Sequence, residues 1–286
     1  MKNIRLFIIS FLKFFIVKFF SKNLICIGFI TCLLFPIFLI QNILSWKLFY
    51  NLKRIIPNRG IRKHFIRYCL AQVDMFIWVT LIPNAYKKSL NHNDFTSIDD
   101  IRKILSRNKG LLLVGMHYGP MCIGYVLHQN GFNPAILSAP GNIPDLDKIP
   151  FNWLLPQDYI FRGEFEGILR HNHSEKRYIN LLLAGRPGMI MIDGTMNNNI
   201  RHIKCLGVDF PIGVFSFKLS IKHSFPFVVI WFSKIKGGGY RLNLKELNFN
   251  TIEDGVSQYG ALQDKIITKD PYRWHNLHVF AKQWNR

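Results

Sequence analysis

Two polar side chains stand directly after short apolar runs of the sequence. Residues 110–116 (GLLLVGM) form an apolar run after a glycine, typical of a buried strand, and His117 follows. Residues 188–192 (GMIMI) form a second such run, which ends at Asp193. In parallel sheets, functional sites gather at the carboxyl ends of the strands. His117, followed by a tight turn at residues 118–120, is therefore a candidate general base toward a hydroxyl that attacks an acyl thioester, with a hydrogen-bonded loop histidine as the alternative.

The sequence around both residues resembles a known enzyme group. The frame LLLVGMHYGPMCIGY resembles the glycerolipid (lysophospholipid) acyltransferase superfamily, in which an acid follows the histidine five positions later, and within it the branch that adds late acyl chains to lipid A. MIDGTM at residues 191–196 resembles the later block of that superfamily, an acid, Gly and Thr after a strand. An N-terminal anchor, the stretch VDFPIGVFSFKLSIKHSFPFVVIWF and the closing DPYRWHNLHVFAKQW extend the likeness in organisation over residues 5–286.

This resemblance implies a membrane-anchored O-acyltransferase of lipid biosynthesis, of the kind that completes the lipid A of lipopolysaccharide. It would move a fatty acyl chain from an acyl thioester, on acyl carrier protein or CoA, to a hydroxyl of a lipid A-type or other glycolipid or lysolipid acceptor. It implies no metal and no organic cofactor. The implied substrate-binding residues are Arg162, Tyr118, Gly119, Gly194 and Thr195. Arg162 is spaced like a family arginine that meets a phosphate, which a planar guanidinium suits; a solvated surface arginine is the alternative.

The sequence departs from the family pattern at Cys122, which occupies the position of the acid; none of the other histidines has an acid five positions later. A neutral thiol does not stabilise an imidazolium as a carboxylate does, and loss of the orienting carboxylate costs a serine protease about 10⁴-fold in kcat. Three hypotheses follow. Asp193 replaces the acid, which requires adjacent strand ends; Cys122 is a nucleophile with His117 as its base; or the chain is a catalytically inactive lipid-binding homologue of the same fold.

The remaining sequence supplies the elements that would position these residues. We expect helices at residues 59–85, 98–108, 121–129, 175–184 and 212–223, strands at residues 110–116, 135–138, 188–192, 225–232 and 240–247, and two helical stretches after that. This alternation predicts an α/β fold of glycerolipid-acyltransferase type, with a mixed, mostly parallel sheet flanked by helices.

An N-terminal transmembrane helix is expected before this domain. Residues 23–46 form a segment without a charged side chain that is long enough to span a membrane. Residues 6–20 are apolar but interrupted by two lysines, as in an interfacial helix. We therefore divide the chain into an anchor at residues 1–46 and an acyltransferase-like domain at residues 47–286. Twelve Lys and Arg but no acid occur in residues 1–73, which predicts attraction to an anionic membrane surface. The basic residues are denser after the span, which favours the cytoplasmic side of a bacterial inner membrane.

Composition and spacing also indicate the compartment, the metal content and the partners of the chain. Five cysteines without a CxxC pair favour a reducing compartment. Two close histidine pairs lack a cysteine or carboxylate to complete a metal site. The net charge of +20 suits an acidic acyl carrier protein. We expect no nucleic acid partner, because no nucleic-acid-reading motif occurs and the charge concentrates at the anchor.

Overall fold

The computed structural model describes residues 31–36, 53, 60–84, 86–138, 167–169, 174–193, 199–236 and 238–277. The helices are α4 (Ile61–Asn84), α5 (Tyr86–Ser89), α6 (Ser97–Ser106), α7 (Ile123–Gln129), α9 (Ser174–Leu183), α10 (Phe215–His223) and α11 (Ile252–Lys269), followed by the 3-10 turn η3 (Pro271–Arg273). The strands are β1 (Leu111–Gly115), β2 (Ala135–Ser138), β3 (Gly167–Leu169), β4 (Pro187–Met191), β5 (Ile200–Cys205), β6 (Val208–Gly213), β7 (Phe227–Lys234) and β8 (Tyr240–Leu247).

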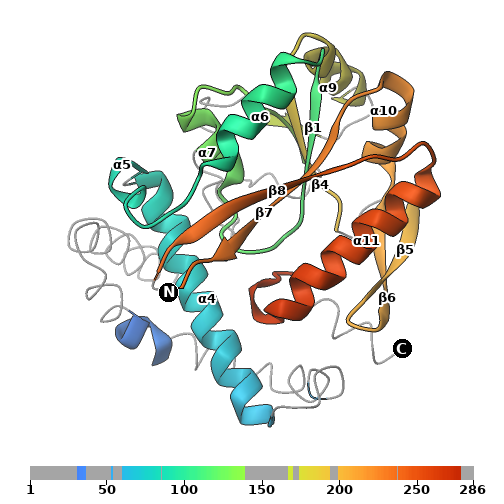
Figure 1. Ribbon diagram of the computed structural model, residues 1–286. Coiled ribbons are helices and arrows are strands. Elements are labelled where there is room, and N and C mark those ends of the chain that lie inside the picture. The colour runs from blue at the N-terminus through green and yellow to red at the C-terminus, as the bar shows by residue number, and fades with distance from the viewer. Residues whose placement is uncertain are drawn as a thin grey trace.

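A central sheet of six strands, in the order β3-β2-β4-β1-β7-β8, organises the described part of the chain. The first five strands of this order run parallel, and β8 returns antiparallel to β7 through a hairpin. β1 lies between β4 and β7, so its carboxyl end is in the middle of the sheet (Figure 1). The expected mixed, mostly parallel sheet flanked by helices is confirmed.

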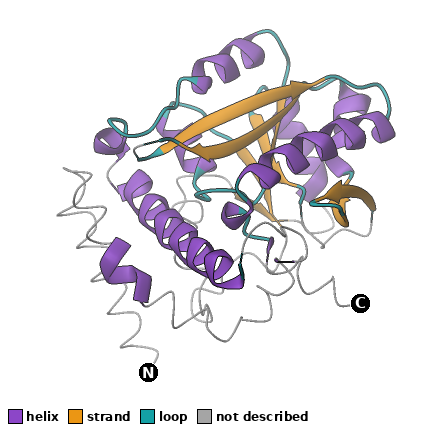
Figure 2. Ribbon diagram, turned by 60° about the horizontal axis from the view of Figure 1, so that its bottom comes forward, coloured by secondary structure: helices purple, strands orange, loops and turns teal. Residues whose placement is uncertain are grey.

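The residues of β1 explain why this strand is central. All five are buried, and the first four alternate between two hydrophobic clusters. Leu112 and Val114 pack with the layer of α9, α10 and α11, whereas Leu111 and Leu113 pack with α6, α7 and the second half of α4. An uninterrupted apolar run is what a parallel strand covered on both faces requires. Figures 1 and 2 show the helices on the two sides of the sheet.

A second, two-stranded sheet of β5 and β6 was not predicted. Its turn consists of Leu206 and Gly207, both with positive φ (52° and 78°), a backbone that suits tight hairpins but that leucine rarely adopts. The expected helix at residues 212–223 was wrong at its start, because Ile212 and Gly213 pair with β5 and the helix begins only at Phe215. The apolar residues at the end of β6 have a spacing that also fits the period of a helix.

The predicted anchor lies mostly outside the described residues. Residues 6–20 are not described, and of residues 23–46 only 31–36 are, as a helical segment. No helix in the described ranges has both the length and the hydropathy needed to cross a membrane. Of the two helical stretches expected near the C-terminus, α11 is present and the second begins as the single turn η3; residues after 277 are not described.

Candidate active site

His117 and Asp193 lie side by side at the carboxyl ends of two neighbouring strands. Gly115, the last residue of β1, pairs with Met191, the last residue of β4, and each polar residue follows two positions after the end of its strand. The Nδ1 atom of His117 is 2.7 Å from Oδ1 of Asp193. The backbone N–H of His117 also donates to both oxygens of that carboxylate, at 3.0 and 2.9 Å. The adjacency that a replacement acid at Asp193 requires is therefore present.

Asp193 is completely buried and surrounded by donors. Nε1 of Trp274 donates to Oδ2 at 3.0 Å, and Nδ2 of Asn276 approaches the same oxygen at 3.4 Å and bonds the backbone carbonyl of Asp193. A buried carboxylate is costly unless hydrogen bonds replace its hydration. Here both oxygens have partners, so the carboxylate is held in one orientation with Oδ1 facing the imidazole.

The imidazole of His117 is bonded through Nδ1 and is partly exposed. Its side chain remains 28% exposed, and no described residue bonds Nε2. Burial works against the charged ring, but the negative charge of Asp193 and its hydrogen bond outweigh burial, so the pKa of His117 lies above its ordinary value. Such a ring donates from Nδ1 to the acid and leaves the lone pair of Nε2 to accept a proton.

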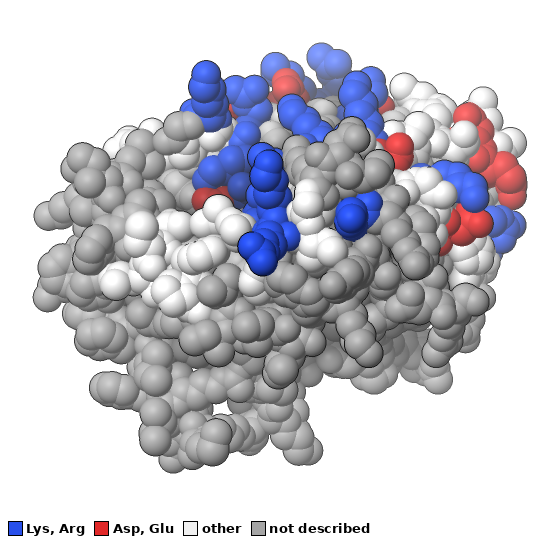
Figure 3. Space-filling model, turned by 90° about the horizontal axis from the view of Figure 1, so that it is seen from below, with Lys and Arg blue, Asp and Glu red and all other residues white. Residues whose placement is uncertain are grey.

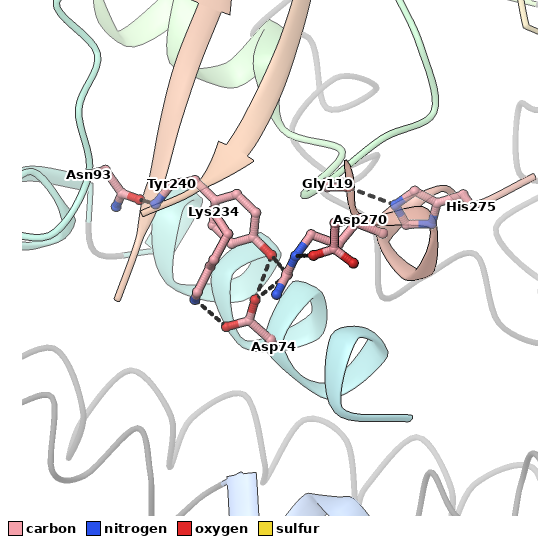
Figure 4. Close-up of polar contacts among 8 residues, drawn as sticks. Asp74, Asn93, Gly119, Lys234, Tyr240, Asp270 and His275 are labelled. Carbon is pink, nitrogen blue, oxygen red and sulfur yellow. Dashed lines mark hydrogen bonds and ion pairs between the residues drawn. The ribbon is translucent and has the colours of Figure 1, made fainter. Parts of the chain in front are cut away.

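The segment after η3 runs antiparallel along the turn that carries His117. Tyr118 and Trp274 form a β-bridge. The N–H of His275 donates to the carbonyl of His117 at 2.7 Å, and the N–H of Gly119 donates to the carbonyl of Arg273 at 3.0 Å. The ring of His275 bonds the carbonyl of Gly119 at 2.7 Å (Figure 4). Residues 273–275 therefore pair with residues 117–119 as a short strand would.

The turn itself depends on Gly119. Its φ is +75°, a backbone conformation that favours glycine, and a Cβ added there would lie 2.9 Å from Cβ of Phe232. Both backbone polar groups of Gly119 are already bonded to the segment at residues 273–275. Tyr118 is only 4% exposed and belongs to the core. These two predicted substrate-binding residues thus have a clear part in shaping the turn.

A charged cluster lies beside this segment. Asp74 of α4 accepts from Lys234 at 2.5 Å, from the hydroxyl of Tyr240 at 2.6 Å and from Arg273 at 2.5 Å, while Asp270 accepts from Arg273 at 2.8 Å (Figure 4). Burial alone would raise the pKa of Asp74, but the charges of Lys234 and Arg273 lower it below its ordinary value. Two acids balance two bases, so the cluster joins α4, the β7–β8 hairpin and η3 without net charge.

Cys122, five positions after His117, is buried in a different hydrophobic cluster from the tryptophan that bonds Asp193. It precedes α7, is 1% exposed and packs in the cluster on the α6–α7 side of the sheet, whereas Trp274, which bonds Asp193, belongs to the other cluster. Burial raises the pKa of its thiol far above the ordinary value. Among the described residues, no hydrogen bond joins Cys122 to His117. A neutral, buried thiol is a poor nucleophile.

The structure does not describe the remaining predicted substrate-binding residues. Arg162, Gly194 and Thr195 lie outside the described residues. Within the described ranges no three His, Cys, Asp or Glu side chains gather where they could hold a metal ion. Prediction also missed Trp274 and Asn276 as partners of Asp193. Their only signal is the polar and aromatic tail DPYRWHN, and no spacing rule connects it to a residue more than 80 positions away.

No family model matches the sequence, and no curated protein matches it significantly. The geometry of the site therefore has to support any functional proposal.

Proposed function

We propose that the chain is a membrane-anchored O-acyltransferase in which His117 is the general base and Asp193 is the orienting acid. The observation that carries the proposal is the 2.7 Å contact between Nδ1 of His117 and the fully buried carboxylate of Asp193. This pair supplies what the acid five positions after the histidine supplies in the acyltransferases that the sequence resembles. The proposed acceptor is a lipid A-type or other glycolipid or lysolipid hydroxyl.

In the proposed reaction, Nε2 of His117 takes the proton of the acceptor hydroxyl while its oxygen attacks the carbonyl carbon of an acyl thioester. The tetrahedral intermediate then expels the thiolate, which receives the proton from the imidazolium. The products are an acyl ester and the free thiol of acyl carrier protein or CoA. Asp193 stabilises the imidazolium while it exists and fixes the tautomer that leaves Nε2 free. No step needs a metal or an oxidant.

Two observations favour Asp193 over Cys122 as the partner of the base. The thiol of Cys122 is buried among apolar side chains, and its raised pKa keeps it neutral, so it neither orients the imidazole by charge nor attacks readily. Asp193, in contrast, contacts both the ring and the backbone of His117. We therefore do not favour an acyl-enzyme on Cys122.

The first half of α4 supports an association with an anionic membrane. Its exposed face carries Arg62, Lys63 and Arg67 together with Ile66 and Leu70, which are 45% and 40% exposed. Figure 3 shows the side of the molecule at which α4 begins: on its described part, Lys and Arg stand among uncharged residues with a few Asp and Glu between them, and the largest group of Asp and Glu lies at one edge. Basic and apolar side chains on one helix face suit a lipid surface.

The same half of α4 is close to the site. Its buried face packs against η3, where Nδ1 of the buried His64 is 2.7 Å from the hydroxyl of Tyr272. A bilayer against the exposed face would therefore present lipid hydroxyls near the end of the sheet that carries His117. This placement suits an acceptor that remains in the membrane.

The test is acyl transfer by the purified full chain in detergent or nanodiscs. Radiolabelled acyl-carrier protein or acyl-CoA is offered with a lysolipid or a lipid A precursor. We expect transfer by the wild type, and a loss of at least about 10²-fold in His117→Ala, because general base catalysis contributes about 10²–10⁴-fold.

Cys122→Ala is the matched control, since it changes a buried residue near the same turn. It should keep most of the activity, whereas its complete inactivation would favour the acyl-enzyme route. If wild type and His117→Ala are both folded and show only the same background rate of acyl transfer, the enzyme hypothesis is refuted. The inactive lipid-binding homologue then remains.

A further inference from the structure

We propose that Trp274 is a positioning residue for the His117–Asp193 pair, and that residues 273–276 are part of the active site although none of them reaches the reacting atoms. The inference rests on the proposed function for its catalytic meaning. Its structural content, that Trp274 fixes which nitrogen of His117 carries the proton, is testable without any substrate.

The two oxygens of Asp193 are divided between two kinds of donor. Oδ1 faces Nδ1 of His117 at 2.7 Å, and Oδ2 receives Nε1 of Trp274 at 3.0 Å. The backbone N–H of His117 reaches both oxygens and so does not select one of them for the ring. Nδ2 of Asn276 is a longer contact at 3.4 Å. The indole N–H is therefore the donor that turns the carboxylate so that Oδ1 remains at the imidazole.

Trp274 is itself rigidly held. It is completely buried, and its ring meets that of Phe210 edge-on, with 4.8 Å between the centroids. Its backbone pairs with Tyr118 of the turn that carries His117. The preceding residue, Arg273, is bonded to Asp74 and Asp270. A donor fixed on both sides keeps its direction, which is what positioning a catalytic carboxylate requires.

The chain offers a matched control for removing an indole N–H. Trp78 of α4 is also completely buried, but its Nε1 has no hydrogen-bond partner among the described residues. Trp274→Phe and Trp78→Phe therefore make the same chemical change at the same burial. Only the first of them takes a donor away from Asp193.

The experiment measures the tautomer of His117 by NMR in the ¹⁵N-histidine-labelled full chain, at a pH above the pKa of this residue. The His117 signals are assigned by comparison with His117→Gln. In the wild type we expect the proton on Nδ1. In Trp274→Phe the ratio of the Nδ1–H to the Nε2–H tautomer should fall about tenfold, as expected when a hydrogen bond to a charged group is lost. Trp78→Phe should keep the wild-type ratio.

An unchanged tautomer ratio in a folded Trp274→Phe protein would overturn the proposal, and so would an equal change in Trp78→Phe. Should Trp274→Phe not fold, the indole N–H resonance of Trp274 serves instead. It should lie downfield in the wild type and move upfield in Asp193→Asn, and an unmoved resonance would again overturn the proposal. None of these readouts depends on acyl transfer, so failure of the proposed reaction is a separate result.

Where the wild type transfers acyl groups, the kinetics add a second readout. Trp274→Phe should lower kcat about 10-fold to 100-fold, the loss expected for one charge-assisted hydrogen bond, while KM changes less than about twofold. A variant that raises KM and leaves kcat unchanged would contradict a role in positioning the base.

Discussion

At the scale of single residues, the proposed acyltransferase would take the acid of its site from a distant strand instead of from the position five after the histidine. An acid five positions after a histidine reaches it across one turn of chain. Here the carboxylate comes from another strand, 76 residues away, and it binds the backbone of His117 as well as the ring. The base is consequently sensitive to anything that moves β1 relative to β4.

The charge of Asp193 should give the proposed activity a specific pH dependence. Only neutral His117 accepts a proton, so kcat/KM of the wild type should rise with pH through the raised pKa of this residue. Asp193→Asn removes the charge that raises this pKa and leaves the burial that lowers it. The acid limb of the pH–rate profile should therefore move to lower pH, while the plateau falls by about 10²–10⁴-fold.

The control for this profile is Asp209→Asn, which changes an exposed acid that is paired with Lys204 and that no described hydrogen bond or ion pair joins to His117 or Asp193. It should leave both the limb and the plateau in place. An acid limb that stays where it is in Asp193→Asn would show that this carboxylate does not set the pKa of the base.

At the scale of elements, the cluster around Asp74 is the joint between the helix that follows the expected anchor and the segment that completes the site. One carboxylate bonds Lys234 at the end of β7, Tyr240 at the start of β8 and Arg273 in η3. Asp74 is the first acid of the chain, after a long stretch of only basic residues. Asp74 therefore both connects these three elements and supplies negative charge to neighbouring cations.

Asp74→Asn should destabilise the fold substantially. Removing Asp74 leaves the mostly buried Arg273 and the partly buried Lys234 with only Asp270 to balance them, which costs about 3 kcal/mol and corresponds to a fall in Tm of about 6–12 °C for a domain of this size. Thermal unfolding of the full chain measures it. Because folding lowers the pKa of Asp74, the advantage of the wild type should be complete above the ordinary pKa of aspartate and disappear as the pH falls through the lowered one.

The exposed pair of Lys204 and Asp209 again supplies the comparison. Asp209→Asn should change stability by less than about 1 kcal/mol, because ion pairs in water contribute little. Equal effects of Asp74→Asn and Asp209→Asn would mean that the cluster around Asp74 is not a structural joint.

The elements also show what a sequence reveals and what it does not. β1 and β4 could be predicted because their apolar runs are continuous, and His117 and Asp193 could be selected because both follow such runs. β5 and β6 could not, because IRHIKC has no strong alternation and the turn uses Leu206 in a conformation foreign to leucine. Trp274 could not be assigned to Asp193, since only the pairing of residues 273–275 with residues 117–119 brings them together.

At the scale of the whole molecule, the exposed charges and the sheet topology favour the same side of the molecule as the one that would face a membrane. The exposed basic and apolar residues of α4 lie at the end of the sheet where β1 and β4 finish, while the opposite end carries other exposed basic residues without a comparable apolar stripe on one helix. The total charge of +20 by itself says nothing about orientation. The placement of α4 does.

A triple substitution on α4 tests this orientation. In a protein of residues 47–286, checked for folding by circular dichroism, Arg62→Glu, Lys63→Glu and Arg67→Glu together should weaken binding to phosphatidylglycerol vesicles. The expected fall is about 10²-fold, at roughly 1 kcal/mol for each basic residue near the surface. Vesicle sedimentation at low salt measures it.

The matched variant reverses the same number of exposed charges at the other end of the sheet: Arg107→Glu, Lys109→Glu and Lys222→Glu. It should bind vesicles nearly as well as the unchanged domain. If both triple variants lose binding equally, the attraction reflects net charge and α4 is not the docking face.

The pairing of the C-terminal segment with the catalytic turn also determines when during synthesis the site comes into being. The contacts that form it join residues from 76 to more than 150 positions apart, and the last of them involve Trp274, His275 and Asn276. A growing chain on the ribosome has therefore made β1 and β4 long before it can fix Asp193. Contacts of such long range form late in folding, because the intervening loops must close first. If the proposed activity is correct, a nascent or partly folded chain would carry no oriented base, and catalytic competence would arrive together with the completed fold.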